Sequence, residues 1–94
     1  MVNKYIVIEA YYKPEKLTSG KLTKIIRTIL DNGYEITRIG NRELSFIKGF
    51  GIKSKMLSLE VIEESTYMDK MLIKTNDVEI ADKLESLIKE LKLA

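Results

Sequence analysis

Hydrophobic positions along this chain follow two periods, one typical of helices and one typical of strands. From Ser19 to Asn32, and again after Asn76, apolar residues recur every three or four positions, so each stretch is expected to form a helix with one apolar face. Such a helix is soluble only if that face covers a sheet or another helix. The apolar faces comprise Leu22, Ile25, Ile26, Ile29 and Leu30 in the first helix and Ile80, Ala81, Leu84, Leu87, Ile88 and Leu91 in the second.

Capping residues define where the two helices begin and end. Thr18 or Ser19 is the expected N-cap of the first helix, and Asn32-Gly33 ends it because glycine adopts a left-handed conformation without steric cost. The second helix opens at Asn76-Asp77-Val78-Glu79, where a cap residue is followed three positions later by glutamate. The rest of the chain lacks the helical period, and we expect it to form strands and turns.

Stretches rich in β-branched and aromatic residues are predicted to be strands. The first stretch is nearly continuously apolar, which favours a strand in the interior of a sheet. Gly40-Asn41 is expected to form a tight hairpin turn, and a second turn is expected near Ser65-Thr66. Residues 48–55 are glycine-interrupted and basic, and form either a loop or a bulged continuation of a strand. The expected strands are residues 3–12, 34–39, 44–47, 56–63 and 68–73.

The resulting order of elements, βαββββα, predicts an α+β fold. Sequential antiparallel strands and two amphipathic helices form a two-layer sandwich, with a mostly antiparallel sheet of about five strands and both helices on one face. The 94 residues fit a single domain, residues 1–94. A domain of this size is only marginally stable, so we expect association into a homodimer.

Composition removes most catalytic chemistry. The chain has no cysteine and no histidine, which excludes thiol nucleophiles, the commonest metal ligands and the commonest general base near neutral pH. No pair of carboxylates has a spacing that assigns acid and base roles. We therefore expect a protein that is not an enzyme, with no catalytic residues, no metal and no cofactor. The apolar run at the amino terminus is too short for a signal peptide or a spanning helix, which predicts a cytoplasmic protein without a membrane partner.

One stretch resembles a known family. Gly20, Leu22 and Ile25 open the first helix, and Leu30, Gly33, Ile36 and Ile39 close it and begin the next strand. This pattern resembles the signature of ACT domains, which are small regulatory domains with a ferredoxin-like fold. The resemblance implies pairing with a second copy and binding of a small ligand, often an amino acid, near the first strand-to-helix loop. By this resemblance the ligand-binding residues are Ser19, Gly20 and Leu22.

A basic segment suggests a different function. Lys48-Gly49-Phe50-Gly51 matches the start of the core sequence of RNA-recognition motifs, in which an aromatic residue stacks on a base. Cationic residues within one hairpin and its loop are spaced to meet phosphates. The alternative is a solubilising basic loop that pairs with Glu60, Glu63 and Glu64. The candidate nucleic-acid-binding residues are Arg38, Arg42, Lys48, Phe50, Lys53 and Lys55.

Two adjacent tyrosines are candidates for an interface. If Tyr11 and Tyr12 extend an exposed edge strand, they form an adhesive patch for a second subunit or a partner protein. The first functional hypothesis is therefore a non-enzymatic binding or regulatory domain, homodimeric, that engages a protein partner or a small ligand. The second hypothesis is a nucleic-acid-binding module that uses residues 38–55.

Overall fold

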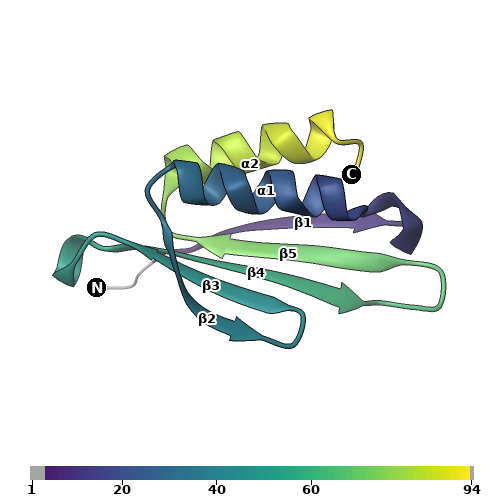
Figure 1. Ribbon diagram of the computed structural model, residues 1–94, viewed down its shortest axis with the longest axis horizontal. Helices are drawn as coiled ribbons and strands as arrows, with labels where there is room; N and C mark the ends of the chain where they lie inside the picture. The colour runs from purple at the N-terminus through teal and green to yellow at the C-terminus, as the bar shows by residue number, and fades with distance from the viewer. Residues whose placement is uncertain (1–3, 94) are drawn as a thin grey trace.

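A computed structural model describes residues 4–93, so Asn3, the first residue of the first expected strand, lies outside the described residues. The fold is an α+β sandwich with a five-stranded antiparallel sheet and two helices, which confirms the expected fold class (Figure 1). Two short 3-10 helices, η1 and η2, interrupt the connections. The elements are β1 (Ile6–Tyr12), η1 (Pro14–Lys16), α1 (Ser19–Asp31), β2 (Glu35–Gly40), β3 (Glu43–Lys48), η2 (Gly51–Lys53), β4 (Lys55–Glu63), β5 (Asp69–Thr75) and α2 (Val78–Glu90).

The order of strands in the sheet is β1-β5-β4-β3-β2. Strands β2 to β5 form one meander, and β1 pairs antiparallel with β5. This differs from a ferredoxin-like β-α-β-β-α-β order, because four strands follow α1 without an α-helix between them. The prediction that the first strand lies inside the sheet is wrong: β1 is an edge strand. Its apolar run arises because one face packs in the core while Tyr5 and Val7 lie on the other face.

The strand register aligns side chains into rows that cross the sheet. One row on the helix side contains Ile8, Ile73, Leu59, Leu44 and Ile39, in order from β1 to β2. The first three are buried, Leu44 is half-buried, and Ile39 is 76% exposed. A fully buried aliphatic side chain contributes about 1.5–3 kcal/mol to stability. The hydrophobic core therefore lies over β1, β5 and β4, includes the buried Phe46 of β3, and becomes thinner towards β2.

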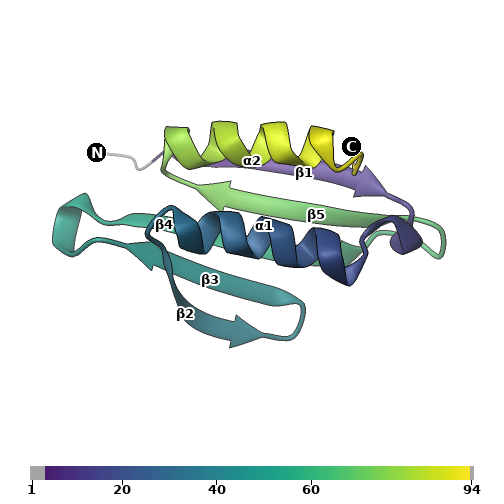
Figure 2. The ribbon, with the colours of Figure 1, turned by 45° about the horizontal axis from the view of Figure 1, so that its top comes forward.

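The helices do not cover the whole sheet. Two adjacent helices, each about 10 Å wide, cover roughly four strands spaced about 4.8 Å apart, and this sheet has five. Figure 2 shows β2 and much of β3 lying beyond α1, on the side away from α2. Ile25 and Ile29 are fully buried as predicted, but Leu30, expected in the same buried face, is 40% exposed. Leu30 lies on the flank of α1 that has no second element beside it.

The hairpin between β2 and β3 turns one residue later than predicted. Gly40 pairs with Glu43, so the turn residues are Asn41 and Arg42 rather than Gly40-Asn41. Arg42 adopts φ +66°, the left-handed conformation that the sequence favoured for glycine or asparagine. The position of the turn could not be predicted to within one residue, because Gly40 and Asn41 each suit a turn whether it begins at residue 40 or at residue 41.

The two α-helices of the described residues, 4–93, are too short and too polar to span a lipid bilayer.

Candidate functional site

Apolar side chains on the uncovered side of α1 (Figure 2) and on β2 and β3 form one apolar surface, which we call the α1 trough. The opposite flank of α1 faces α2, because Lys24 pairs with Glu90 and Lys83 donates to Asn32 Oδ1 at 2.7 Å. The trough therefore has two sides. On α1 it is lined by residues that recur every four positions on the free flank, and on the sheet by the apolar residues of β2 and β3. The residues of the α1 trough are Leu22, Ile26, Leu30, Ile36, Ile39 and Leu44.

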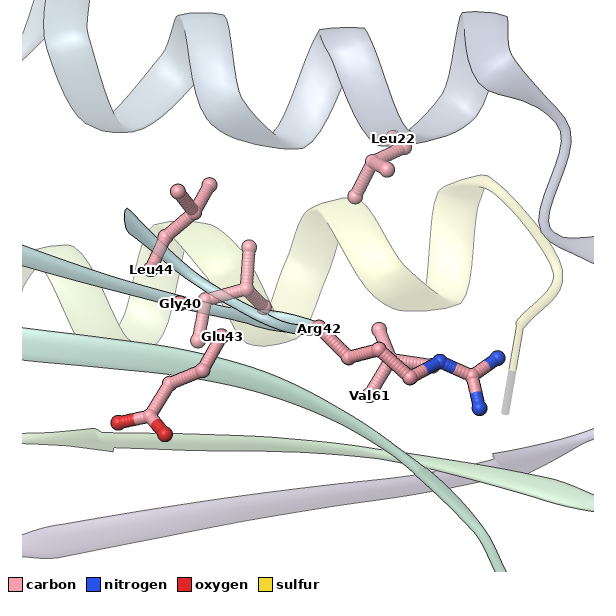
Figure 3. Close-up of a pocket in the computed structure, with 7 residues that line it drawn as sticks. Leu22, Gly40, Arg42, Glu43, Leu44 and Val61 are labelled. Carbon is pink, nitrogen blue, oxygen red and sulfur yellow. The ribbon is translucent and has the colours of Figure 1, made fainter. Parts of the chain in front are cut away.

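A hollow of about 210 Å³ opens at one end of the trough. Figure 3 shows Leu22 pointing from α1 towards the sheet, where Leu44 and Val61 lie beneath it. The lining is mostly aliphatic, and Glu43 points to the other side of the sheet. This chemistry suits a small apolar side chain rather than a charged ligand.

One ion pair lies at the polar end of this hollow. Arg42 bonds Glu63 Oε1 through one guanidinium nitrogen at 2.7 Å, and both side chains are largely in solvent. An exposed pair of this kind contributes about 0–1 kcal/mol. Arg42 also accepts a backbone hydrogen bond from Val61 at 3.0 Å, which holds the β2–β3 turn against β4. The turn is therefore a fixed wall of the hollow.

The structure separates the three ligand-binding residues implied by the ACT resemblance. Leu22 lines the 210 Å³ hollow, whereas Ser19 and Gly20 are exposed at the start of α1 and do not line it. The N-cap is Thr18, whose hydroxyl accepts a hydrogen bond from the backbone of Lys21 at 3.2 Å. Of the three, only Leu22 belongs to the candidate site.

The candidate nucleic-acid-binding residues do not form one surface: Arg38 and Arg42 lie apart from each other and from the remaining four. Arg42 precedes β3 and Lys48 ends it, and a six-residue strand spans roughly 17 Å. Arg38 pairs with Ser45 in the middle of β3, on the face of the sheet away from the helices. The remaining four residues, which we call the basic loop, are Lys48, Phe50, Lys53 and Lys55.

The basic loop is highly exposed. Phe50 is 95% exposed and Ile52 lies fully in solvent beside it. Lys48 places its ammonium group 5.8 Å from the centre of the Tyr34 ring. Of the expected pairs of a solubilising segment, Arg42 forms one with Glu63, whereas in the described part of the chain no lysine of the basic loop pairs with Glu60, Glu63 or Glu64.

The two candidate interface tyrosines point to opposite faces of β1. Tyr11 lies on the open face, donates to Glu9 Oε2 at 3.2 Å, and has the Lys70 ammonium 5.7 Å from its ring centre. Tyr12 is only 4% exposed, and its hydroxyl has no hydrogen-bond partner among residues 4–93. Burial, and then the nearby Asp69 carboxylate, raise the pKa of Tyr12 to about 12. Tyr12 therefore belongs to the core, and only Tyr11 can contact a partner.

Within residues 4–93, no group of three or more aspartate or glutamate residues gathers to hold a metal ion. The trough residues Ile39 and Leu44 and the hollow residue Val61 were not identified as site residues from the sequence, because their grouping depends on which strands the helices leave uncovered. The only signal was the apolar spacing of Ile36 and Ile39 in the strand after α1.

Comparison with known proteins adds no relative: no protein-family model matches this chain, and no curated protein matches it.

Proposed function

We propose that this chain is a non-enzymatic binding domain that works as a homodimer, and that the α1 trough is the surface through which two copies associate. The observation that carries the proposal is Ile39, which is 76% exposed at the end of a row in which three members are buried and Leu44 is half-buried. Burying one such side chain at an interface stabilises the complex by about 1.5–3 kcal/mol. An association that covers the trough recovers this energy in both copies.

A second copy suits the trough because the surface is self-complementary. It carries both a projecting side chain, Ile39, and an aliphatic hollow lined by Leu22 and Leu44. A two-fold axis places the projection of each copy in the hollow of the other. The same patch then serves both subunits, so two copies close without leaving a free trough.

The solution mass of the chain and of an Ile39→Lys variant tests this proposal. We expect twice the monomer mass for the parent by light scattering, and the monomer mass for Ile39→Lys. Since Ile39 is exposed within one copy, the variant is expected to keep the parent's circular dichroism and to unfold at a similar temperature in dilute solution.

Val7→Lys is the matched control. Val7 is a half-exposed β-branched residue on the open face of the sheet, opposite the trough. The Val7→Lys variant should therefore keep the dimer mass. The proposal is wrong if the parent is a monomer at every concentration, or if Val7→Lys dissociates the dimer while Ile39→Lys does not.

A second candidate function is nucleic-acid binding by the basic loop, and the exposure of Phe50 beside three lysines favours it. An exposed aromatic ring stacks on a base while lysines meet phosphates. Affinity for a short single strand should then fall steeply between about 50 and 200 mM salt. Lys53→Glu with Lys55→Glu should abolish it, and absence of binding at low salt excludes this function.

A further inference from the structure

A larger hollow lies on the face of the sheet that the helices leave free. Its volume is about 520 Å³, within the range of roughly 300–1,000 Å³ typical of small-molecule sites. Residues from all five strand regions line it, from Tyr5 before β1 to Thr37 in β2. Thr37 is the extra residue of a bulge between Ile36 and Arg38, and bulges increase the local twist of a strand. We call this the open-face hollow.

Polar side chains form a row across the open face of the sheet; Lys74, Ser58 and Ser45 line the hollow, and Arg38 lies at the β2 end of the row, beyond the lining residues. Lys74 pairs with Ser58, Ser58 with Ser45, and Ser45 with Arg38, so the four share one face and one row. Adjacent strands are about 4.8 Å apart, so the Cα atoms of Lys74 and Arg38 are separated by roughly 14 Å. Both side chains are long enough to reach towards the two hydroxyls between them. The row therefore presents two cations flanking two hydroxyl groups.

These four side chains are free to bind a ligand. Among residues 4–93, none of them forms a hydrogen bond or an ion pair with another residue. An anion placed over the serines would receive charge-assisted hydrogen bonds from both ends of the row. Surface lysines are commonly unpaired, but Lys74 also lines a concave site.

The neighbouring rows define how a ligand would lie. On one side of the polar row, Tyr5, Met56 and Ile47 form an apolar wall of the hollow. On the other side, Glu60 and Glu43 stand opposite each other on the same face. The two carboxylates repel an anion, so its apolar body must extend towards the apolar wall while its charged group stays over the serines.

We propose that the open-face hollow binds an organic anion that has an apolar body and a single carboxylate or phosphate group. Lys74 and Arg38 would neutralise the anionic group, Ser58 and Ser45 would donate hydrogen bonds to it, and the Tyr5 side chain would pack on the apolar body. This site goes beyond the proposed self-association and does not depend on it, because the hollow and the α1 trough lie on opposite faces of the sheet.

Titration calorimetry with octanoate, octyl phosphate and octanol tests the proposal. The three probes share one apolar chain and differ in the head group. We expect one of the anions, or both, to bind once per chain and at least tenfold more tightly than neutral octanol. Preference between the two anions identifies the head group that the site accepts. Equal affinity for octanol, or no binding of either anion at millimolar concentration, would overturn the proposal.

Variants locate the binding site. Lys74→Met should weaken anion binding about tenfold and leave octanol binding unchanged, whereas Lys13→Met, at an exposed position after β1, should change neither. If Lys74→Met does not fold, Arg38→Met tests the other end of the row. Unchanged anion affinity in both row variants would contradict the site. A monomeric parent chain that binds one anion would reject the proposed dimer and still support this inference.

Discussion

The Tyr34 hydroxyl donates a hydrogen bond to Asp77 Oδ2 at 2.7 Å and so joins the end of the α1 connection to the start of α2. Asp77 is also the N-cap of α2, because its Oδ1 accepts from the backbone of Glu79 at 3.1 Å. The Asp77 backbone in turn donates to Thr75 Oγ1 at 3.1 Å, and Thr75 donates to the Met56 carbonyl at 2.7 Å. The Asp77 carboxylate therefore joins the connection after α1 to the start of α2, and the Asp77 backbone joins α2 to the sheet.

Removing either partner of this contact should destabilise the fold. Tyr34→Phe loses a part-buried hydrogen bond to a charged group and should lower the free energy of unfolding by about 1.5–3 kcal/mol. Asp77→Ala should cost more, because it also removes a cap with a typical value of about 1 kcal/mol. Chemical denaturation measures both, and a double variant gives the coupling energy. A Tyr34→Phe variant as stable as the parent would show that the contact contributes nothing.

Two buried tyrosines predict a loss of stability in alkaline solution. Burial, and then the hydrogen bond to Asp77, raise the pKa of Tyr34 above its ordinary value of 10, while that of Tyr12 is raised to about 12. Below pH 10, folded and unfolded chains both keep these protons, and stability is unaffected. From pH 10 to about 12 the unfolded chain releases protons that the folded chain retains. Each tyrosine then lowers the free energy of unfolding by about 1.4 kcal/mol per pH unit.

The comparison that checks this effect is the slope of stability against pH between 10 and 12. A Tyr12→Phe/Tyr34→Phe double variant should have a shallower slope than the parent. Tyr67→Phe, at an exposed position, should keep the parent's slope. Identical slopes in all three proteins would mean that neither tyrosine holds its proton more tightly in the folded state.

Tyr12→Phe should stabilise the protein near neutral pH. Its hydroxyl is buried without a partner among the described residues, and an unsatisfied buried polar group costs about 1–3 kcal/mol. Phenylalanine keeps the ring in the core and removes that cost. Thermal unfolding should show a higher midpoint for Tyr12→Phe, and little change for Tyr11→Phe, whose hydroxyl contacts exposed Glu9. A lower midpoint for Tyr12→Phe would disprove this interpretation.

Neighbouring positions on α1 should respond differently to truncation. Ile29→Ala creates a cavity under the helix and should cost about 2–5 kcal/mol. Leu30→Ala removes a side chain that lies in the trough, so within a single copy it should cost less than about 1 kcal/mol. Chemical denaturation in dilute solution, where the chain is monomeric, measures the free energy of unfolding of both variants. An equal loss of this free energy in Ile29→Ala and Leu30→Ala would mean that the trough is covered within one copy.

Much of the fold was predictable because local signals agree. The period of Ile25 and Ile29, the polar residue Thr18 before them and Gly33 after them are separate indications of the same helix, and the structure places α1 between these ends. Gly33 has φ +90°, as the sequence required at that position. Local propensity and capping were sufficient here because they involve residues close in sequence.

The candidate sites were less predictable because they depend on contacts between distant residues. Arg38 and Lys74 share a row only through three successive strand pairings, and a shift of one residue in any of them would move one of the two to the opposite face. Similarly, Leu30 has the helical spacing of a core residue. Its exposure follows from a sheet wider than two helices, which no local pattern encodes.

Disulfide trapping is the most direct test of association through the α1 trough. The chain contains no cysteine, so Ile39→Cys and Leu22→Cys can each be introduced alone and the two variants mixed in a glutathione redox buffer. Because Ile39 of one copy is proposed to enter the hollow beside Leu22 of the other, the mixture should form a disulfide-linked heterodimer in excess over both homodimers. A heterodimer no more abundant than that from Val7→Cys with Leu22→Cys would contradict the account.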